Sequence, residues 1–204
     1  MLTRRLMLSL PLVAALAGKA GIARADQLDQ ASGFIQQTGN ELTAVINGSA
    51  SAAQKQDQLQ AVVDRAVDVD GVARFCLGRF WRTASPAQQS AYLGLFRHVL
   101  MLSLTGKLGD YQGVSFVMGK PAAREGGVLV ATVINRPNAP ASKVDWLVGT
   151  DSGSPKIIDV VAEGVSMRQT QRSDYLSFLG QHGNSVQALI DALKQQTGKP
   201  QAGG

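Results

Sequence analysis

The chain has 204 residues, a single cysteine and a formal net charge of +5, with 20 Lys and Arg residues against 15 Asp and Glu residues. This length fits one globular domain with a sizeable core, and the single cysteine excludes a disulfide-stabilised scaffold, because an intrachain disulfide needs two thiols. Four of the basic residues lie in the first 25 positions, so the rest of the chain has 16 basic against 15 acidic residues and a net charge of +1. This near-balance excludes the broad basic surface that nucleic-acid binding requires.

The N-terminal 25 residues have the pattern of a secretory signal peptide. Arg4 and Arg5 precede an apolar run of about 12 residues that ends at Ala17, and Ala23 and Ala25 supply the small residues of a cleavage site. Since a membrane-spanning helix needs roughly 20 apolar residues, this run is too short for an anchor. We expect cleavage after Ala25 and export to the periplasm, and the arginine pair also suits the twin-arginine route.

The chain after residue 25 shows neither an internal repeat nor an interdomain linker, so residues 26–204 are expected to form one domain. Apolar side chains recur at three-and-four spacing through residues 28–45 and predict an amphipathic helix. Ser51 is expected to cap a second helix, and Asp68 or Asp70 a short third one. This part of the chain is therefore predicted to be helical.

The clearest helix start lies at Ser85. Ser85 and Gln88 form a capping-box pattern, and Pro86 stands at the first helical position, where its missing N–H costs nothing. The helix is expected to end at Gly106 or Gly109. Because its apolar residues cover several sides, we expect it to be buried on more than one side.

The hydrophobic period changes to two in the next part of the chain. Four runs alternate apolar with polar residues, and turn-rich segments separate them. The apolar face is expected to hold Val114, Phe116, Val130, Ile134, Val144, Trp146, Val148, Ile158 and Val160. Short connections and one apolar face predict an antiparallel meander of about four strands. Asp145 and Asp159 alternate away from this face, and Asp159 and Glu163 are expected to be solvated.

Two further helices complete the predicted order. Ser166 begins a second capping-box pattern with Gln169, and Asn184 or Ser185 can cap a last helix. Helices, one antiparallel sheet and helices again make an α+β fold, in which the helices wrap over one face of the sheet.

No pattern of catalytic or metal-binding residues stands out. The sequence has no nucleophile elbow and no phosphate or dinucleotide loop, and His98 and His182 are far apart. Cys76 lies in an apolar helical stretch and is expected to be a small core residue. Asp159 and Glu163 could form a carboxylate pair, but two solvated charges are the expected state. We therefore expect a binding protein without metal or cofactor, and not an enzyme.

Residues 74–82 contain three arginines and three aromatic residues within nine positions. In one interpretation the arginines meet an anionic headgroup, while the aromatic rings meet acyl chains or a membrane interface. In the other, the arginines are solvated and the rings pack into the core. The second interpretation is favoured for Phe75 and Trp81, and both stay open for the arginines.

Two stretches resemble the signature of the toluene-tolerance family, the periplasmic MlaC-type phospholipid-binding proteins. The first shares with the family the order and spacing of Leu77, Gly78, Phe80, Trp81, Ala84, Ser85, Pro86, Gln88, Tyr92, Phe96 and Arg97. The second comprises residues 159–167 followed by residues 171–175. Together with the signal peptide, the resemblance covers most of the chain.

This resemblance implies an α+β fold that encloses an apolar cavity, with acyl chains inside and the headgroup facing water. It implies a carrier that moves phospholipid between an inner-membrane ABC transporter, met through its lipid-binding ring subunit, and an outer-membrane lipoprotein complex. One branch of the family is associated with hopanoids, so a hopanoid or another apolar solute stays open as the alternative ligand. A small hydrolase or isomerase is a third class, and it would need an ionisable residue inside the cavity.

The sheet face and the helix after Ser85 would form the cavity walls in such a fold. The expected lipid contacts are Phe96, Leu100, Val130, Trp146, Val148 and Val160. Arg79 and Arg82 are the expected contacts with the headgroup or a partner protein. Tryptophan at both Val130 and Val148 is expected to abolish lipid retention and to leave the fold intact.

Overall fold

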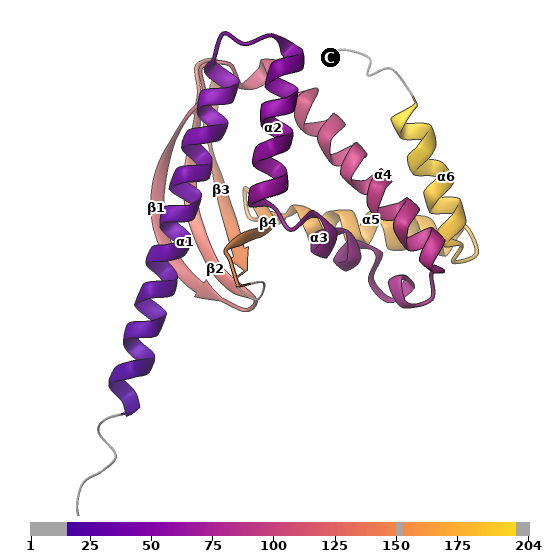
Figure 1. Ribbon diagram of the computed structural model, residues 1–204, viewed down its shortest axis with the longest axis horizontal. Helices are drawn as coiled ribbons and strands as arrows, with labels where there is room; N and C mark the ends of the chain where they lie inside the picture. Colours follow the sequence, from indigo (N-terminus) through magenta and orange to yellow (C-terminus); the bar gives the residue numbers. More distant parts are fainter. Residues whose placement is uncertain (1–15, 150–152, 199–204) are drawn as a thin grey trace, which may run out of the picture.

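A five-stranded antiparallel sheet forms one layer of the protein (Figure 1). The computed structural model describes residues 16–149 and 153–198. The strands follow one another in chain order: β1 (Ser115–Arg124), β2 (Gly127–Arg136), β3 (Ala139–Gly149), β4 (Lys156–Ala162) and β5 (Val165–Ser166). The predicted meander is confirmed, and the two-residue β5 adds a short fifth strand beside β4.

The described residues include six α-helices. They are α1 (Leu16–Asn47), α2 (Ala52–Ala66), α3 (Val69–Leu77), α4 (Pro86–Thr105), α5 (Met167–Gln181) and α6 (Val186–Thr197), with short 3-10 helices η1 (Gly78–Arg82) and η2 (Gly109–Tyr111). Helix α1 lies across the sheet, while α4 and α6 lie to one side of it (Figure 1). Helix α1 packs on β1 and β2, whereas α3 packs on α5 and α4 on α6. The α+β fold with helices over one sheet face is therefore confirmed.

Side-chain caps fix where most helices begin. Ser51 and Ser85 both form complete capping boxes, and Pro86 occupies the start of α4 as predicted. Asp68 rather than Asp70 caps α3, and Ser185 rather than Asn184 caps α6. Each of these four residues accepts a hydrogen bond from a backbone N–H in the first turn, which satisfies a donor that the helix itself cannot pair.

One irregularity in the sheet changes which residues face the helices. Trp146 pairs with Val160, but the register shifts by one residue before Val148 pairs with Ile157. The extra residue in β4 is a bulge, which breaks the strict alternation of faces. Ile157, which was not predicted on the apolar face, is therefore buried opposite Val148 in the sheet. Ile158, which was predicted there with Val160, is the unpaired residue of the bulge and lines the pocket described below.

Buried side chains form two apolar clusters. The sheet cluster lies between the sheet, α1 and the end of α2, and it holds Ala31, Ile35, Ala66, Val128, Val130, Val148 and Ile157. The larger helical cluster joins α2 to α6 and centres on Tyr92, whose ring contacts those of Phe96 and Tyr175 at centroid distances of 6.0 and 6.2 Å. The described residues therefore form two packed cores, and Val67, between α2 and α3, packs against both of them.

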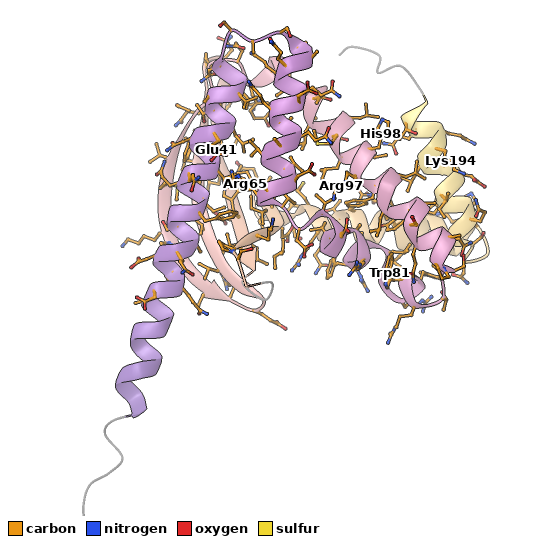
Figure 2. All side chains as sticks on the ribbon, viewed as in Figure 1. Glu41, Arg65, Trp81, Arg97, His98 and Lys194 are labelled. Atoms are coloured by element: carbon orange, nitrogen blue, oxygen red, sulfur yellow. The ribbon has the colours of Figure 1, made fainter. Side chains whose placement is uncertain are left out.

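Ion pairs connect the helices on their exposed sides (Figure 2). Arg65 of α2 pairs with Glu41 of α1, and Arg97 of α4 pairs with Asp64 and, at 3.4 Å, with Asp70. These side chains are partly exposed, so each pair contributes at most about 1 kcal/mol. Apolar packing, rather than these pairs, holds the helices together.

The predicted signal peptide extends into the first helix. Its residues 1–15 lie outside the described residues, and the expected cleavage after Ala25 falls within α1, whose first turns extend beyond the sheet (Figure 1). Leu28, Ala31 and Ile35 of α1 pack in or against the sheet cluster, and cleavage after Ala25 would keep all three. Among the described helices, none is long and apolar enough to cross a membrane.

Candidate binding pocket

An apolar pocket of about 170 Å³ lies where the two clusters meet. Its walls come from the segment between α2 and α3, from α3 and α4, from β4 and from the first turns of α5. The lining residues are Val67, Val69, Val72, Cys76, Phe96, Leu100, Ile157, Ile158, Asp159, Val160, Met167, Arg168 and Gln171. Apolar side chains predominate, and the charged groups come only from β4 and α5.

Three of the six predicted lipid contacts line this pocket. Phe96 and Leu100 lie one turn apart on α4, and Val160 reaches it from β4. The other three belong to the adjoining sheet cluster, in which Val130 and Val148 are fully buried and Trp146 is half-buried. The structure thus brings Phe96, Leu100 and Val160 together in the pocket lining and places the other three on β2 and β3 in the sheet cluster.

Trp146 and its neighbour Thr132 are linked by hydrogen bonds beside the sheet cluster. The indole N–H of Trp146 donates to the hydroxyl of Thr132 at 3.0 Å, and that hydroxyl donates to the carbonyl of Val144 at 2.6 Å. Tryptophan at Val130 or Val148 would overpack this region and cost about 1–3 kcal/mol for each change. The pocket is therefore better tested at Leu100, which lines it directly and is only half-buried.

The arginines predicted to meet a headgroup lie outside the pocket lining. Arg79 and Arg82 are exposed on η1, where Arg79 lies over the ring of Phe80 at 5.0 Å. Phe80 is buried, and Phe75 and Trp81 pack against the helical cluster, as expected for core aromatics. Figure 2 shows Trp81 in η1, at the end of the molecule away from the sheet.

Asp159 is buried, so the prediction that it is solvated is wrong. Its carboxylate accepts hydrogen bonds from the Ser166 hydroxyl at 2.6 Å and the Arg168 backbone N–H at 3.1 Å, and it pairs with the Arg168 guanidinium at 3.4 Å. The turn at Glu163 and Gly164, where both residues have positive φ, brings the start of α5 back beside β4. Asp159 therefore holds α5 against the sheet and is not free to act as a general base.

Replacing Asp159 with alanine is expected to lower the free energy of unfolding by about 3 kcal/mol, because two hydrogen-bond donors and the Arg168 guanidinium lose a buried anionic partner. Urea denaturation followed by circular dichroism measures this change. Asp191→Ala is the matched control, since Asp191 and its partner Lys194 are both more than half exposed, and it should cost less than about 0.5 kcal/mol. Equal losses in the two variants would contradict the structural role of Asp159.

Cys76 is a fully buried residue of the helical cluster, as predicted, and it also lines the pocket. Its Sγ lies 3.6 Å from the Arg168 carbonyl oxygen. Burial raises the pKa of the thiol to about 12, against the opposing effect of the Arg172 and Arg168 charges. The thiol is therefore protonated at neutral pH and unsuited to be a nucleophile.

Alkylation of Cys76 by iodoacetamide at pH 8 is expected to be at least about 100-fold slower in the native protein than in urea, because the thiolate is the reactive form. Because the fold favours the protonated thiol, the contribution of Cys76 to stability is complete below about pH 9 and is lost as the pH rises towards the pKa of about 12. Mass spectrometry of timed samples measures the alkylation rate of Cys76 in the native protein and in urea. Native and unfolded rates within tenfold of each other would contradict the burial of the thiol.

Several lining residues were not predicted, chiefly Val69 and Val72 of α3 and Met167, Arg168 and Gln171 of α5. The capping pattern at Ser166 predicts where α5 begins. The hydrogen bond from Ser166 to Asp159, which places the start of α5 beside β4, is visible only in the assembled fold. Among the described residues, no three His, Cys, Asp or Glu side chains are grouped so as to hold a metal ion.

The fold and the pocket define a class of protein: a single meander sheet with helices over one face and an apolar pocket between sheet and helices. The family model for the MlaC protein matches residues 36–195, and the chain therefore belongs to the MlaC family. A solved structure of similar fold is described as the phospholipid-binding protein from Ralstonia solanacearum in complex with a phospholipid. It is 19% identical, with a TM-score of 0.72 over 82% of this chain and 97% of that chain.

Proposed function

We propose that the protein is a periplasmic phospholipid carrier and does not catalyse a reaction. The observation that supports this most is the pocket itself, which is lined by apolar residues such as Phe96, Leu100 and Val160 and has charged groups only at β4 and α5. Membership of the MlaC family and the fold shared with a protein solved in complex with a phospholipid agree with this proposal.

The size of the pocket has a consequence for how acyl chains would enter. A volume of about 170 Å³ lies below the 300–1,000 Å³ of typical small-molecule sites, so it holds only part of a diacyl lipid. The pocket lies on the boundary between the sheet cluster and the helical cluster. Separation of α4 from β4 along this boundary would enlarge it without exposing the interior of either cluster.

Burial of acyl chains would supply the binding energy. Each methylene group removed from water contributes about 0.8 kcal/mol, which offsets the cost of taking a lipid out of a membrane. In the proposed route, the protein receives and delivers phospholipid between the ring subunit of an inner-membrane ABC transporter and an outer-membrane lipoprotein complex. Export through the predicted signal peptide would place it between the two membranes.

A transfer experiment tests the carrier function. Donor vesicles hold a fluorescent phospholipid, acceptor vesicles hold none, and a membrane permeable to the protein but not to vesicles separates them. Transfer should rise in proportion to protein concentration and need no nucleotide. Transfer at the rate of buffer alone would contradict the proposal, and transfer of a hopanoid but not of a phospholipid would favour the alternative ligand.

A further inference from the structure

We propose that Arg168 and Arg172 form an anion site beside the pocket that binds the phosphate group of the lipid, an inference that rests on the proposed function. The two residues lie four positions apart on α5 and so project from the same face of the helix. Arg168 lines the pocket, and both guanidinium groups lie over the ring of Phe75, at 4.5 and 5.0 Å from its centroid.

The charges around these arginines are not balanced. Asp159 is the carboxylate that pairs with Arg168, and it also accepts from the Ser166 hydroxyl and the Arg168 backbone N–H. Arg172 donates to the carbonyl of Phe75 at 2.5 Å, and that acceptor carries no charge. One of the two guanidinium groups therefore pairs with a carboxylate and the other does not, which leaves a net positive charge next to an apolar pocket.

A buried donor in the same place lacks a partner. Among the described residues, two buried side-chain polar atoms make no hydrogen bond, and Arg168 Nε is one of them. It lies 3.4 Å from the carboxylate of Asp159, without the alignment that a hydrogen bond needs. Because an unpaired buried donor is costly, the site is suited to an additional acceptor.

A phosphate group fits these donors. A guanidinium presents five N–H groups in a planar fork that matches phosphate oxygens. The pairing of Arg168 with Asp159 and the hydrogen bond from Arg172 to Phe75 use few of these donors. Helices α3 and α5 pack side by side (Figure 1), so Phe75 of α3 holds both guanidinium planes in place. The amide of Gln171, which also lines the pocket, adds a neutral donor.

Gly78 makes room for Arg172. It has a φ of +59°, and a Cβ atom there would come within 2.8–3.0 Å of the Arg172 guanidinium. The absence of a side chain at this position therefore lets the guanidinium lie against the backbone between α3 and η1. The site would select a phosphate-bearing diacyl lipid over a neutral lipid with the same chains.

Competitive uptake tests this selectivity. The full chain is incubated with vesicles that contain equal amounts of dioleoyl phosphatidylglycerol and dioleoylglycerol, and the lipid bound to the recovered protein is quantified by mass spectrometry. The unmodified protein should prefer the phosphate-bearing lipid by at least about 10-fold, because charge-assisted hydrogen bonds are lost with the neutral one. Arg168→Gln/Arg172→Gln should reduce this preference, measured as the ratio of the two bound lipids, to about 2-fold or less.

Two further variants make the result interpretable. Lys120→Gln/Arg124→Gln also removes two positive charges, but from exposed positions of β1, and should keep the full preference. Arg172→Gln alone leaves the hydrogen bonds and ion pair of Asp159 intact, so this variant should fold even if the double variant folds poorly. Because it removes one of the two guanidinium groups, it should lose part of the preference. An unchanged preference in both Arg172 variants would overturn the inference.

A second measurement distinguishes a lipid phosphate from free phosphate as the ligand of this site. Phosphorus NMR with inorganic phosphate shows whether the lipid-free protein binds the bare ion. Binding of the ion that is lost in Arg168→Gln/Arg172→Gln, without any lipid preference in the unmodified protein, would assign the site to free phosphate and overturn the lipid assignment. No uptake of either lipid would instead contradict the proposed function itself.

Discussion

Replacing Leu100 with tryptophan is expected to lower the amount of bound phospholipid at least about 10-fold, because the larger ring would fill a pocket that is already small for a lipid. Leu100 is half-buried on α4 and packs against the helical cluster from the pocket side. Uptake of a fluorescent phospholipid from vesicles by the purified protein measures the effect. The melting temperature shows whether the fold survives the change.

His98→Trp is the matched control for this experiment. His98 is exposed on the same helix, two positions before Leu100 (Figure 2), so its replacement adds the same ring outside the pocket. This variant should bind phospholipid as the unmodified protein does. Undiminished binding by a folded Leu100→Trp protein would show that the pocket between α4 and β4 is not where the acyl chains lie.

Replacing Tyr92 with alanine is expected to reduce the free energy of unfolding by about 4 kcal/mol, as truncation of a large buried ring does in other proteins. Tyr92 is fully buried, and its hydroxyl donates to the Ala73 carbonyl at 2.8 Å. Its ring joins Phe96 and Tyr175 in the centre of the helical cluster. The loss would leave a cavity between α3, α4 and α5, and urea denaturation measures its cost.

Tyr92→Phe separates the ring from the hydroxyl. It keeps the packing and removes one hydrogen bond, so it should cost about 1 kcal/mol. Burial also raises the pKa of both Tyr92 and Tyr175 above their usual value of 10.0, so their contribution to stability is complete below pH 10 and is lost at higher pH. A Tyr92→Ala protein as stable as Tyr92→Phe would contradict the central position of this ring.

Local patterns predicted the elements of the fold well. The Ser85, Pro86 and Gln88 pattern marks the start of α4, and two-residue alternation marks β1 to β4, because both signals depend on neighbours along the chain. The Asn184 and Ser185 alternative could not be resolved from sequence. Asn184 adopts positive φ and ends the preceding turn, which leaves Ser185 as the cap of α6.

Features that depend on contacts between distant segments were predicted less well. The bulge in β4 depends on its pairing with β3, and it places Ile157 rather than Ile158 opposite Val148. The burial of Asp159 depends on α5 returning to β4 and supplying its partners. Neither residue carries a local signal of its place.

The candidate site illustrates the same limit. Phe96, Leu100 and Val160 were selected as apolar residues on the predicted walls, and they do line the pocket. Arg168 lines it too, but no spacing in the sequence distinguishes Arg168 from the more conspicuous Arg79 and Arg82. The pocket draws residues from α3, α4, β4 and α5, so only the assembled fold brings them together.

Native mass spectrometry of the protein isolated from a periplasmic extract, followed by extraction of its ligand, tests phospholipid binding most directly. The expected result is one added mass that matches a diacyl phospholipid, released on unfolding and identified in the extract. A bound hopanoid, or a protein that carries no lipid and takes none from phospholipid vesicles, would contradict the proposed function.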